Sequence, residues 1–133
     1  MTLEDYFKDG QAYVWDETFA IIQSEEAVPS AFVNIVDRNE ITVIIEQSRL
    51  DIVKVIQIER DWKIFTLDIV FPMDVCGVTA KVGTELAKAG VSIMPMAAYS
   101  RDHFLIKEAD AERARGVFEG MGIKVIQGNR PNL

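Results

Sequence analysis

The chain has 133 residues, of which 49% are hydrophobic and 26% are charged, so it forms one domain or two very small modules that share a core. A net charge of −7 without any Lys/Arg cluster argues against a nucleic-acid partner, because phosphate repels such a chain. No apolar run reaches the roughly 18 residues that span a bilayer, and the acidic start lacks an apolar signal core. We therefore predict a cytoplasmic protein without a membrane partner.

The first half is rich in predicted strands. Extended segments are expected at residues 12–15, 19–23, 32–36 and 41–45. Residues 52–58 fit either a strand or a short helix. Residues 24–31 leave no room for a crossover helix, so if this half repeats the second, it is a trimmed copy. Residues 40–46 lie over 102–108 at an offset of 62, with two identities in seven pairs, which is a weak repeat signal.

The second half has a clearer pattern, which predicts the order βαββαβ. The expected elements are a strand at 62–71, a helix at 75–89, a strand at 91–97, a strand at 103–107, a helix between Asp110 and Gly122, and a strand at 123–126. Asp74 is the expected N-cap of the first helix, and Gly90 suits its left-handed end. Pro95 has no N–H for a sheet ladder, which places its strand at an edge. The fold class predicted is α+β, a ferredoxin-like two-layer sandwich.

A charged interruption at residues 59–61 is the best candidate for a domain boundary. We predict a degenerate module at residues 1–60, a complete module at 61–127 and a flexible tail at 128–133.

Three segments resemble ACT domains of bacterial aspartokinase-like proteins and the last ACT domain of the cytosolic arginine sensors. They are the turn Pro72-Met73-Asp74-Val75-Cys76-Gly77-Val78, the helix end Leu86-Ala87-Lys88-Ala89-Gly90-Val91-Ser92-Ile93 and the hairpin Tyr99-Ser100-Arg101-Asp102-His103-Phe104-Leu105-Ile106. The resemblance covers roughly residues 62–126 and implies paired ACT domains, the first of them degenerate. It also implies that a free amino acid is bound.

The resemblance also implies the ligand-binding residues. They are Asp74, Val75, Cys76, Gly77, Val78, Ala98, Tyr99 and Asp102. The arginine sensors have a glutamate where this chain has Val75 and a threonine where it has Ala98. Both differences favour a small or apolar amino acid over arginine.

The chemistry of such a site follows from the charges of a free amino acid. The N-terminus of a helix offers N–H groups and a positive dipole end to the carboxylate. Gly77 lets the backbone approach a ligand closely, and Asp102 can accept from the ammonium group. The structural alternative is that Gly77 serves helix packing and Asp102 serves the turn, and the two interpretations stand about even.

No catalytic arrangement can be recognised. Cys76, the only cysteine, lacks a readable base, and His103, the only histidine, lies inside a predicted strand. We expect no enzyme activity, no metal and no cofactor. The function predicted is a small amino-acid-binding regulatory protein, and the alternative is an ACT-type dimerisation module without a ligand. A homodimer is expected through strand 91–97, where Met94 and Met96 suit a partner surface, unless the two modules pair within one chain.

Overall fold

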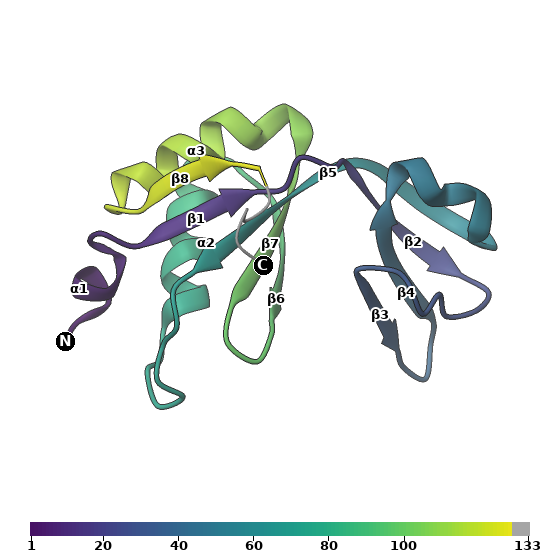
Figure 1. Ribbon diagram of the computed structural model, residues 1–133, viewed down its shortest axis with the longest axis horizontal. Helices are drawn as coiled ribbons and strands as arrows, with labels where there is room; N and C mark the ends of the chain where they lie inside the picture. Colours follow the sequence, from purple (N-terminus) through teal and green to yellow (C-terminus); the bar gives the residue numbers. More distant parts are fainter. Residues whose placement is uncertain (129–133) are drawn as a thin grey trace. The chain divides into compact units, whose positions relative to one another are not determined.

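The computed structural model describes residues 1–128 of the chain, which divides into two compact units (Figure 1). The helical unit consists of Met1–Asp16 together with the described residues from Lys63 onward, and the small unit is Glu17–Trp62. The long strand β5 (Val55–Asp68) runs through both units. None of the helices in residues 1–128 is long and apolar enough to cross a membrane.

The helical unit contains every α-helix of the described chain. Its elements are α1 (Leu3–Phe7), β1 (Gln11–Val14), the second part of β5, α2 (Val78–Lys88), β6 (Ile93–Ala97), β7 (Asp102–Lys107), the 3-10 turn η2 (Glu108–Asp110), α3 (Ala111–Gly120) and β8 (Lys124–Gln127). From β5 onward the elements follow the predicted order βαββαβ.

The sheet of the helical unit has the strand order β8-β1-β5-β7-β6. Without β1, this is the strand order of a ferredoxin-like sandwich, so the predicted fold class is confirmed. The N-terminal strand β1 adds a strand between the last and first strands of this motif, antiparallel to β5 and parallel to β8. Among the strands of residues 1–128, β6 pairs only with β7, which confirms the edge position that Pro95 predicted.

Helices α2 and α3 cover one face of this sheet, where their apolar stripes join the strands in a single core. Val82 and Leu86 of α2 are completely buried there. Phe118 of α3 stacks on Phe65 of β5 with ring centroids 5.5 Å apart, and it meets Phe104 of β7 edge-on at 6.0 Å. This aromatic group ties the second helix to the two central strands.

Both long helices end in the same way. Gly90 and Gly122 follow α2 and α3 with φ of 75° and 91°, a region that side chains disfavour. In each case the glycine and the next residue donate back to the last turn; for example, the N–H of Val91 reaches the carbonyl of Leu86 at 3.0 Å. Both predicted helix ends are thereby confirmed.

The start of α2 differs from the prediction. The helix begins at Val78, and Asp74 is not its N-cap. Gly77 occupies the cap position with a left-handed φ of 89°, which breaks the helical path. Before it, the N–H of Val75 donates to the carbonyl of Pro72 at 3.0 Å, so these residues form a turn instead of a first helical turn.

The small unit repeats the strand pairing of the helical unit with its helices removed. Its elements are β2 (Phe19–Ser24), β3 (Val33–Val36), β4 (Ile41–Glu46), the 3-10 segment η1 (Gln47–Ile52) and the first part of β5. The strand order β3-β4-β2-β5 places second, third, first and last strands side by side, with each neighbouring pair antiparallel. This is the trimmed copy that the sequence suggested.

A loop and η1 replace the two helices as the cover of the small core. Val28 of the loop is buried against Ala20, Ile22, Val43 and Ile45 of the strands, and Leu50 of η1 packs on the same cluster.

The two units match most closely at their third strands. Strands β4 and β7 have the same burial pattern, with three consecutive buried residues, and their last residues, Glu46 and Lys107, have nearly the same dihedrals before a 3-10 turn. This correspondence has an offset of 61 and not the 62 found by residue identity, because burial and backbone geometry define the equivalent positions.

The predicted boundary at residues 59–61 is a bulge inside β5. Between the pairs Ile21–Glu59 and Phe19–Trp62, one residue of β2 lies opposite two of β5, and Asp61 has a φ of 69°. The side chain of Gln47 holds this bulge by accepting from the Asp61 N–H at 2.6 Å and donating to its carboxylate at 3.1 Å.

Residues 1–16 are the main difference from the predicted domains. They were expected in the first module, but they belong to the helical unit because β1 pairs with both β5 and β8. Of the tail predicted at 128–133, Gly128 donates its N–H to the carbonyl of Val14 at 2.8 Å, and residues 129–133 lie outside the described residues.

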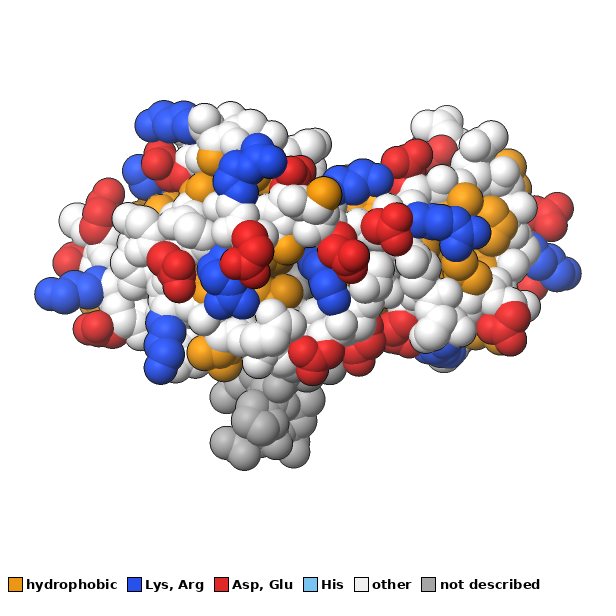
Figure 2. Space-filling model, turned by 90° about the horizontal axis from the view of Figure 1, so that it is seen from above, with side chains coloured by type: hydrophobic (Ala, Val, Ile, Leu, Met, Phe, Trp, Pro, Cys, Tyr) orange, Lys and Arg blue, Asp and Glu red, His pale blue; other side chains and the backbone are white. Residues whose placement is uncertain are grey.

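Charges of both signs are spread over the surface seen in Figure 2. Basic and acidic side chains are interspersed on the described part of this face, without a large basic cluster.

Candidate functional site

A cleft of about 370 Å³ opens in the helical unit between two loops. One bank is the segment from β5 to α2, and the other is the turn of the β6–β7 hairpin. Figure 1 shows both loops at the same end of the strands. The banks are close because β5 and β7 are paired neighbours. The lining residues are Phe71, Pro72, Met73, Val75, Gly77, Val78, Thr79, Ala80, Ala97, Ala98, Tyr99, Ser100 and Asp102.

The N-terminus of α2 forms part of the cleft wall. Val78, Thr79 and Ala80, the first residues of the helix, all line it. Within the described chain no side chain caps this helix, and its first main-chain bond runs from the N–H of Lys81 to the carbonyl of Gly77 at 2.8 Å. The earlier N–H groups lie outside the helical ladder, so the positive end of the helix dipole faces a solvent-accessible space.

Gly77 is required by its backbone conformation. An added Cβ would meet only Leu3 Cδ1, at an ordinary 3.7 Å, so space alone would admit a side chain. The φ of 89° is what favours glycine at this position.

Among the described residues that line the cleft, only Asp102 has a carboxylate side chain. It begins β7 opposite Ala97 of β6 and is half-buried. Burial raises the pKa of its carboxyl above the usual value, because taking a carboxylate out of water disfavours its charged form. A cationic group in the cleft would reverse this penalty.

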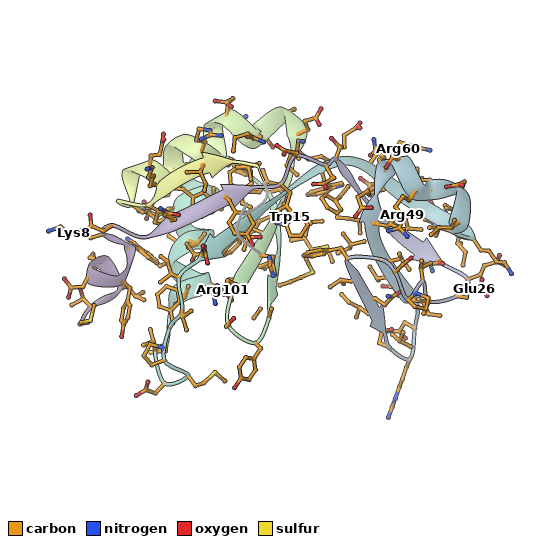
Figure 3. All side chains as sticks on the ribbon, viewed as in Figure 1. Lys8, Trp15, Glu26, Arg49, Arg60 and Arg101 are labelled. Carbon is orange, nitrogen blue, oxygen red and sulfur yellow. The ribbon has the colours of Figure 1, made fainter. Side chains whose placement is uncertain are left out.

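An ion pair braces the hairpin beside the cleft. Arg101, labelled in Figure 3, donates from Nε to Asp68 Oδ1 at the end of β5 over 2.9 Å. Its Nη1 also donates to Ser100 Oγ at 3.1 Å, and the N–H of Ala98 donates to the carbonyl of Arg101 at 2.9 Å. The sequence analysis did not single out Arg101 and Asp68, because a pair separated by 33 residues has no local signal.

The structure brings most of the predicted ligand-binding residues to this one cleft. Val75, Gly77, Val78, Ala98, Tyr99 and Asp102 all line it. Asp74 and Cys76 lie on the same loop, are exposed and do not line it. Cys76 lies before the helix and not in its first turn, because α2 begins later than predicted.

His103 forms a separate hydrogen-bonded group with Thr66 and Trp15. The buried hydroxyl of Thr66 accepts from Trp15 Nε1 at 2.8 Å and lies 2.8 Å from His103 Nδ1. Burial lowers the pKa of His103, which favours a neutral imidazole. Within the described residues, no three His, Cys, Asp or Glu side chains form a metal-binding group.

Comparison with known families identifies the segment that carries the cleft. Residues 57–118 match the family described as "ACT domain". The protein contains an ACT domain. All the predicted ligand-binding residues lie within this segment, while β1 and β8 lie outside it. No curated protein sequence matches the chain.

Solved structures share the fold of the ACT domain and of the small unit at low sequence identity. Protein Atu0741 from Agrobacterium tumefaciens has a TM-score of 0.76 and 18% identity, covering 92% of this chain and 96% of that one. The regulatory subunit of aspartate kinase from Thermus thermophilus has a TM-score of 0.61 and 12% identity, covering 86% and 97%. Aspartate kinase from Clostridium acetobutylicum has a TM-score of 0.67 and 15% identity, covering 86% of this chain and 35% of that chain.

Proposed function

We propose that this protein is a regulatory module whose ACT domain binds a free α-amino acid in the cleft between the β5–α2 loop and the β6–β7 hairpin. An ACT domain in a chain that has the fold of an aspartate kinase regulatory subunit supports a regulatory ligand-binding module in general. The observation that carries the finer proposal is that the start of α2 and the carboxylate of Asp102 line the same cleft.

Each end of an amino acid has a complementary group in the cleft. The α-carboxylate accepts from the N–H groups at the start of α2, where the helix dipole also favours negative charge. The α-ammonium donates to Asp102, in a charge-assisted hydrogen bond. Asp102 is the one acidic side chain among the described lining residues, so the cleft can neutralise one positive charge of a ligand.

The test is a thermal-shift screen of the twenty amino acids. A ligand at about a hundred times its dissociation constant adds roughly 2.7 kcal/mol of stability. Asp102→Asn should remove the shift, and Asp74→Asn is the matched control because Asp74 is an exposed carboxylate on the β5–α2 loop, outside the lining. If no amino acid at millimolar concentration raises the melting temperature, the proposal fails.

Asp102→Asn gives a second readout without any ligand. Since burial raises the pKa of the folded carboxyl above its unfolded value, the folded state is penalised as pH rises through that pKa. The Asn variant should therefore melt at a higher temperature than wild type at pH 7 in the absence of ligand. Higher stability combined with lost binding separates a ligand-binding role of Asp102 from a role in stabilising the turn.

A second candidate function is an interaction module without a small ligand. The observation in its favour is edge strand β6, which pairs on one side only and carries the half-buried Met94 and Met96. An open strand edge is a template for a second copy. Sedimentation of the ligand-free protein tests this candidate: a monomer at high concentration contradicts it, while a dimer combined with no amino-acid shift favours it over ligand sensing.

Absence of enzyme activity and a cytoplasmic location also belong to this proposal. In support of the first, Cys76 and His103 lie in different places, one on the exposed loop and the other bonded to the buried Thr66. A turnover lost in Cys76→Ser or His103→Ala with folding intact would contradict it.

A further inference from the structure

Apart from Asp102, the described residues that line the cleft have uncharged and mostly apolar side chains. Phe71 and Val75 form part of one bank, and Ala97 and Ala98 form part of the other, while Thr79 and Ser100 add hydroxyl groups. The neighbouring cation, Arg101, is bonded to Asp68 and is not part of the lining. A ligand side chain in this cleft therefore meets apolar surface and no second charge.

Two large apolar side chains lie on opposite banks with almost no cover. Met73, on the β5–α2 loop, is 90% exposed, and Tyr99, at the tip of the β6–β7 hairpin, is 96% exposed; both line the cleft. Each has a flexible or rotatable apolar body that can turn over the opening. Contact with an apolar ligand would bury apolar surface of both side chains that is now exposed to water, which favours binding.

We propose that Met73 and Tyr99 determine specificity by packing on the apolar side chain of the bound amino acid, so that the cleft selects neutral apolar amino acids over charged ones. This inference rests on the proposed amino-acid binding at Asp102 and the start of α2. Because the α-ammonium group pairs with the carboxylate of Asp102, the cation of a lysine or arginine side chain would find no second carboxylate among the described lining residues. A glutamate or aspartate side chain would bring a second negative charge near Asp102.

The experiment is isothermal titration of the full chain with glycine, leucine, methionine, phenylalanine, lysine and glutamate. Leucine, methionine or phenylalanine should bind more tightly than lysine and glutamate. Met73→Ala and Tyr99→Ala should each weaken binding of the preferred apolar amino acid by about tenfold, because each removes several apolar carbons from the contact. Glycine, which has no side chain to contact, should bind these variants within about twofold of wild type.

Two matched controls separate packing from other causes. Val70→Ala shortens an exposed apolar residue of the same loop that does not line the cleft, 57% exposed in the wild type, and should leave all affinities unchanged. Tyr99→Phe keeps the ring and loses the hydroxyl, so it should retain the wild-type preference.

The outcomes separate this inference from the proposed function. If amino acids bind but lysine or glutamate binds as tightly as the apolar ones, the specificity inference is overturned while the proposed function stands. It is also overturned if Met73→Ala and Tyr99→Ala weaken the binding of glycine and the binding of leucine by the same factor. If no amino acid binds the wild type, the proposed function fails and this inference fails with it.

Discussion

The helical unit and the small unit have the same strand pairing but differ in what covers the sheet. In the helical unit, α2 and α3 place a continuous apolar core on one face. In the small unit, a loop around Val28 and the η1 segment cover a smaller cluster. The described residues of the small unit also contain no glycine, whereas both helix ends of the helical unit use one. The comparison shows that the same strand order forms with helices in one unit and without them in the other, whereas the cleft is formed partly by a helix.

The difference also explains where the candidate site lies. The cleft wall in the helical unit is the start of α2, reached through the left-handed Gly77. The corresponding connection in the small unit is the loop after β2, which has no helix and so no helix N-terminus to bind an anion. We expect amino-acid binding in the helical unit only.

The largest expected effect comes from the helix-dependent core. Phe118→Ala removes the ring that contacts Phe65 and Phe104, and the free energy of unfolding should fall by about 3–5 kcal/mol. Ile45→Ala, a buried residue of the small core, should cost about 2–4 kcal/mol, because the loop above it can collapse into the space. Urea unfolding followed by circular dichroism measures both, and an equal or larger loss in Ile45→Ala would contradict the comparison.

Each unit contains one buried hydroxyl group among the described residues, and the two should respond differently. Thr66→Val removes the acceptor of the Trp15 indole and the partner of His103, so it should cost about 1–3 kcal/mol. Ser24 donates to the carbonyl of Glu26 at 2.7 Å. Because Glu26 is exposed and water can replace this bond, Ser24→Ala should cost under about 1 kcal/mol. The melting temperatures of the two variants test this order. A larger loss in Ser24→Ala than in Thr66→Val would count against a stabilising role of the hydrogen bonds at Thr66.

Glycine at the end of a helix has a role only in the helical unit. Gly90→Ala forces a side chain into φ of 75° and should lower the free energy of unfolding by about 1 kcal/mol. Gly116→Ala is the control, because it lies inside α3 with no atom within 4 Å of an added Cβ. That substitution should stabilise the protein by about 0.5–1 kcal/mol. Chemical denaturation measures the free energy of unfolding of both variants. A change of the same sign in the two would argue against a requirement for left-handed backbone at Gly90.

The smallest expected effect is a pH dependence that arises in the helical unit. Burial lowers the pKa of His103 below its unfolded value near 6.5, so the neutral form is favoured in the folded protein. Its contribution is fully present above the unfolded pKa and is lost as pH falls through the folded pKa. The melting temperature of wild type should therefore drop on acidification below about pH 6.5 by more than that of His103→Gln. Parallel pH profiles for the two proteins would contradict the shift.

Much of the fold could be predicted because its signals are local. Period-two alternation located the strands, and the three- and four-residue spacing located both helices. Gly90 and Gly122 marked helix ends because positive φ is a property of a single residue. Pro95 placed β6 at an edge because the missing N–H excludes a second neighbour on that side. The cleft residues were predicted from the resemblance of the turn and the hairpin to ACT domains, and not from a local conformational signal.

Other features depend on contacts between distant segments. Strand β1 inserts between β5 and β8, so residues 1–16 belong with the second half of the chain, which no local pattern indicates. The charged segment at 59–61 was the best candidate for a domain boundary, and only pairing with β2 and the contact to Gln47 make it a bulge, just before the division of the two units after Trp62. The ion pair of Arg101 with Asp68 and the hydroxyl shared by Trp15 and His103 likewise join strands that meet only in the folded sheet.

The sequence by itself determined the order βαββαβ of the second half, the ends of α2 and α3 and the edge strand, because each depends on the conformational preference or periodicity of neighbouring residues; it did not indicate α1, and the segments that bear the candidate site were predicted from their resemblance to ACT domains. The tertiary structure alone decided the place of β1, the later start of α2, and which predicted residues line the cleft. Sheet pairing fixes the first. For the other two, the left-handed Gly77 sets the path of the loop, which brings Val75 into the cleft and leaves Asp74 and Cys76 in solvent.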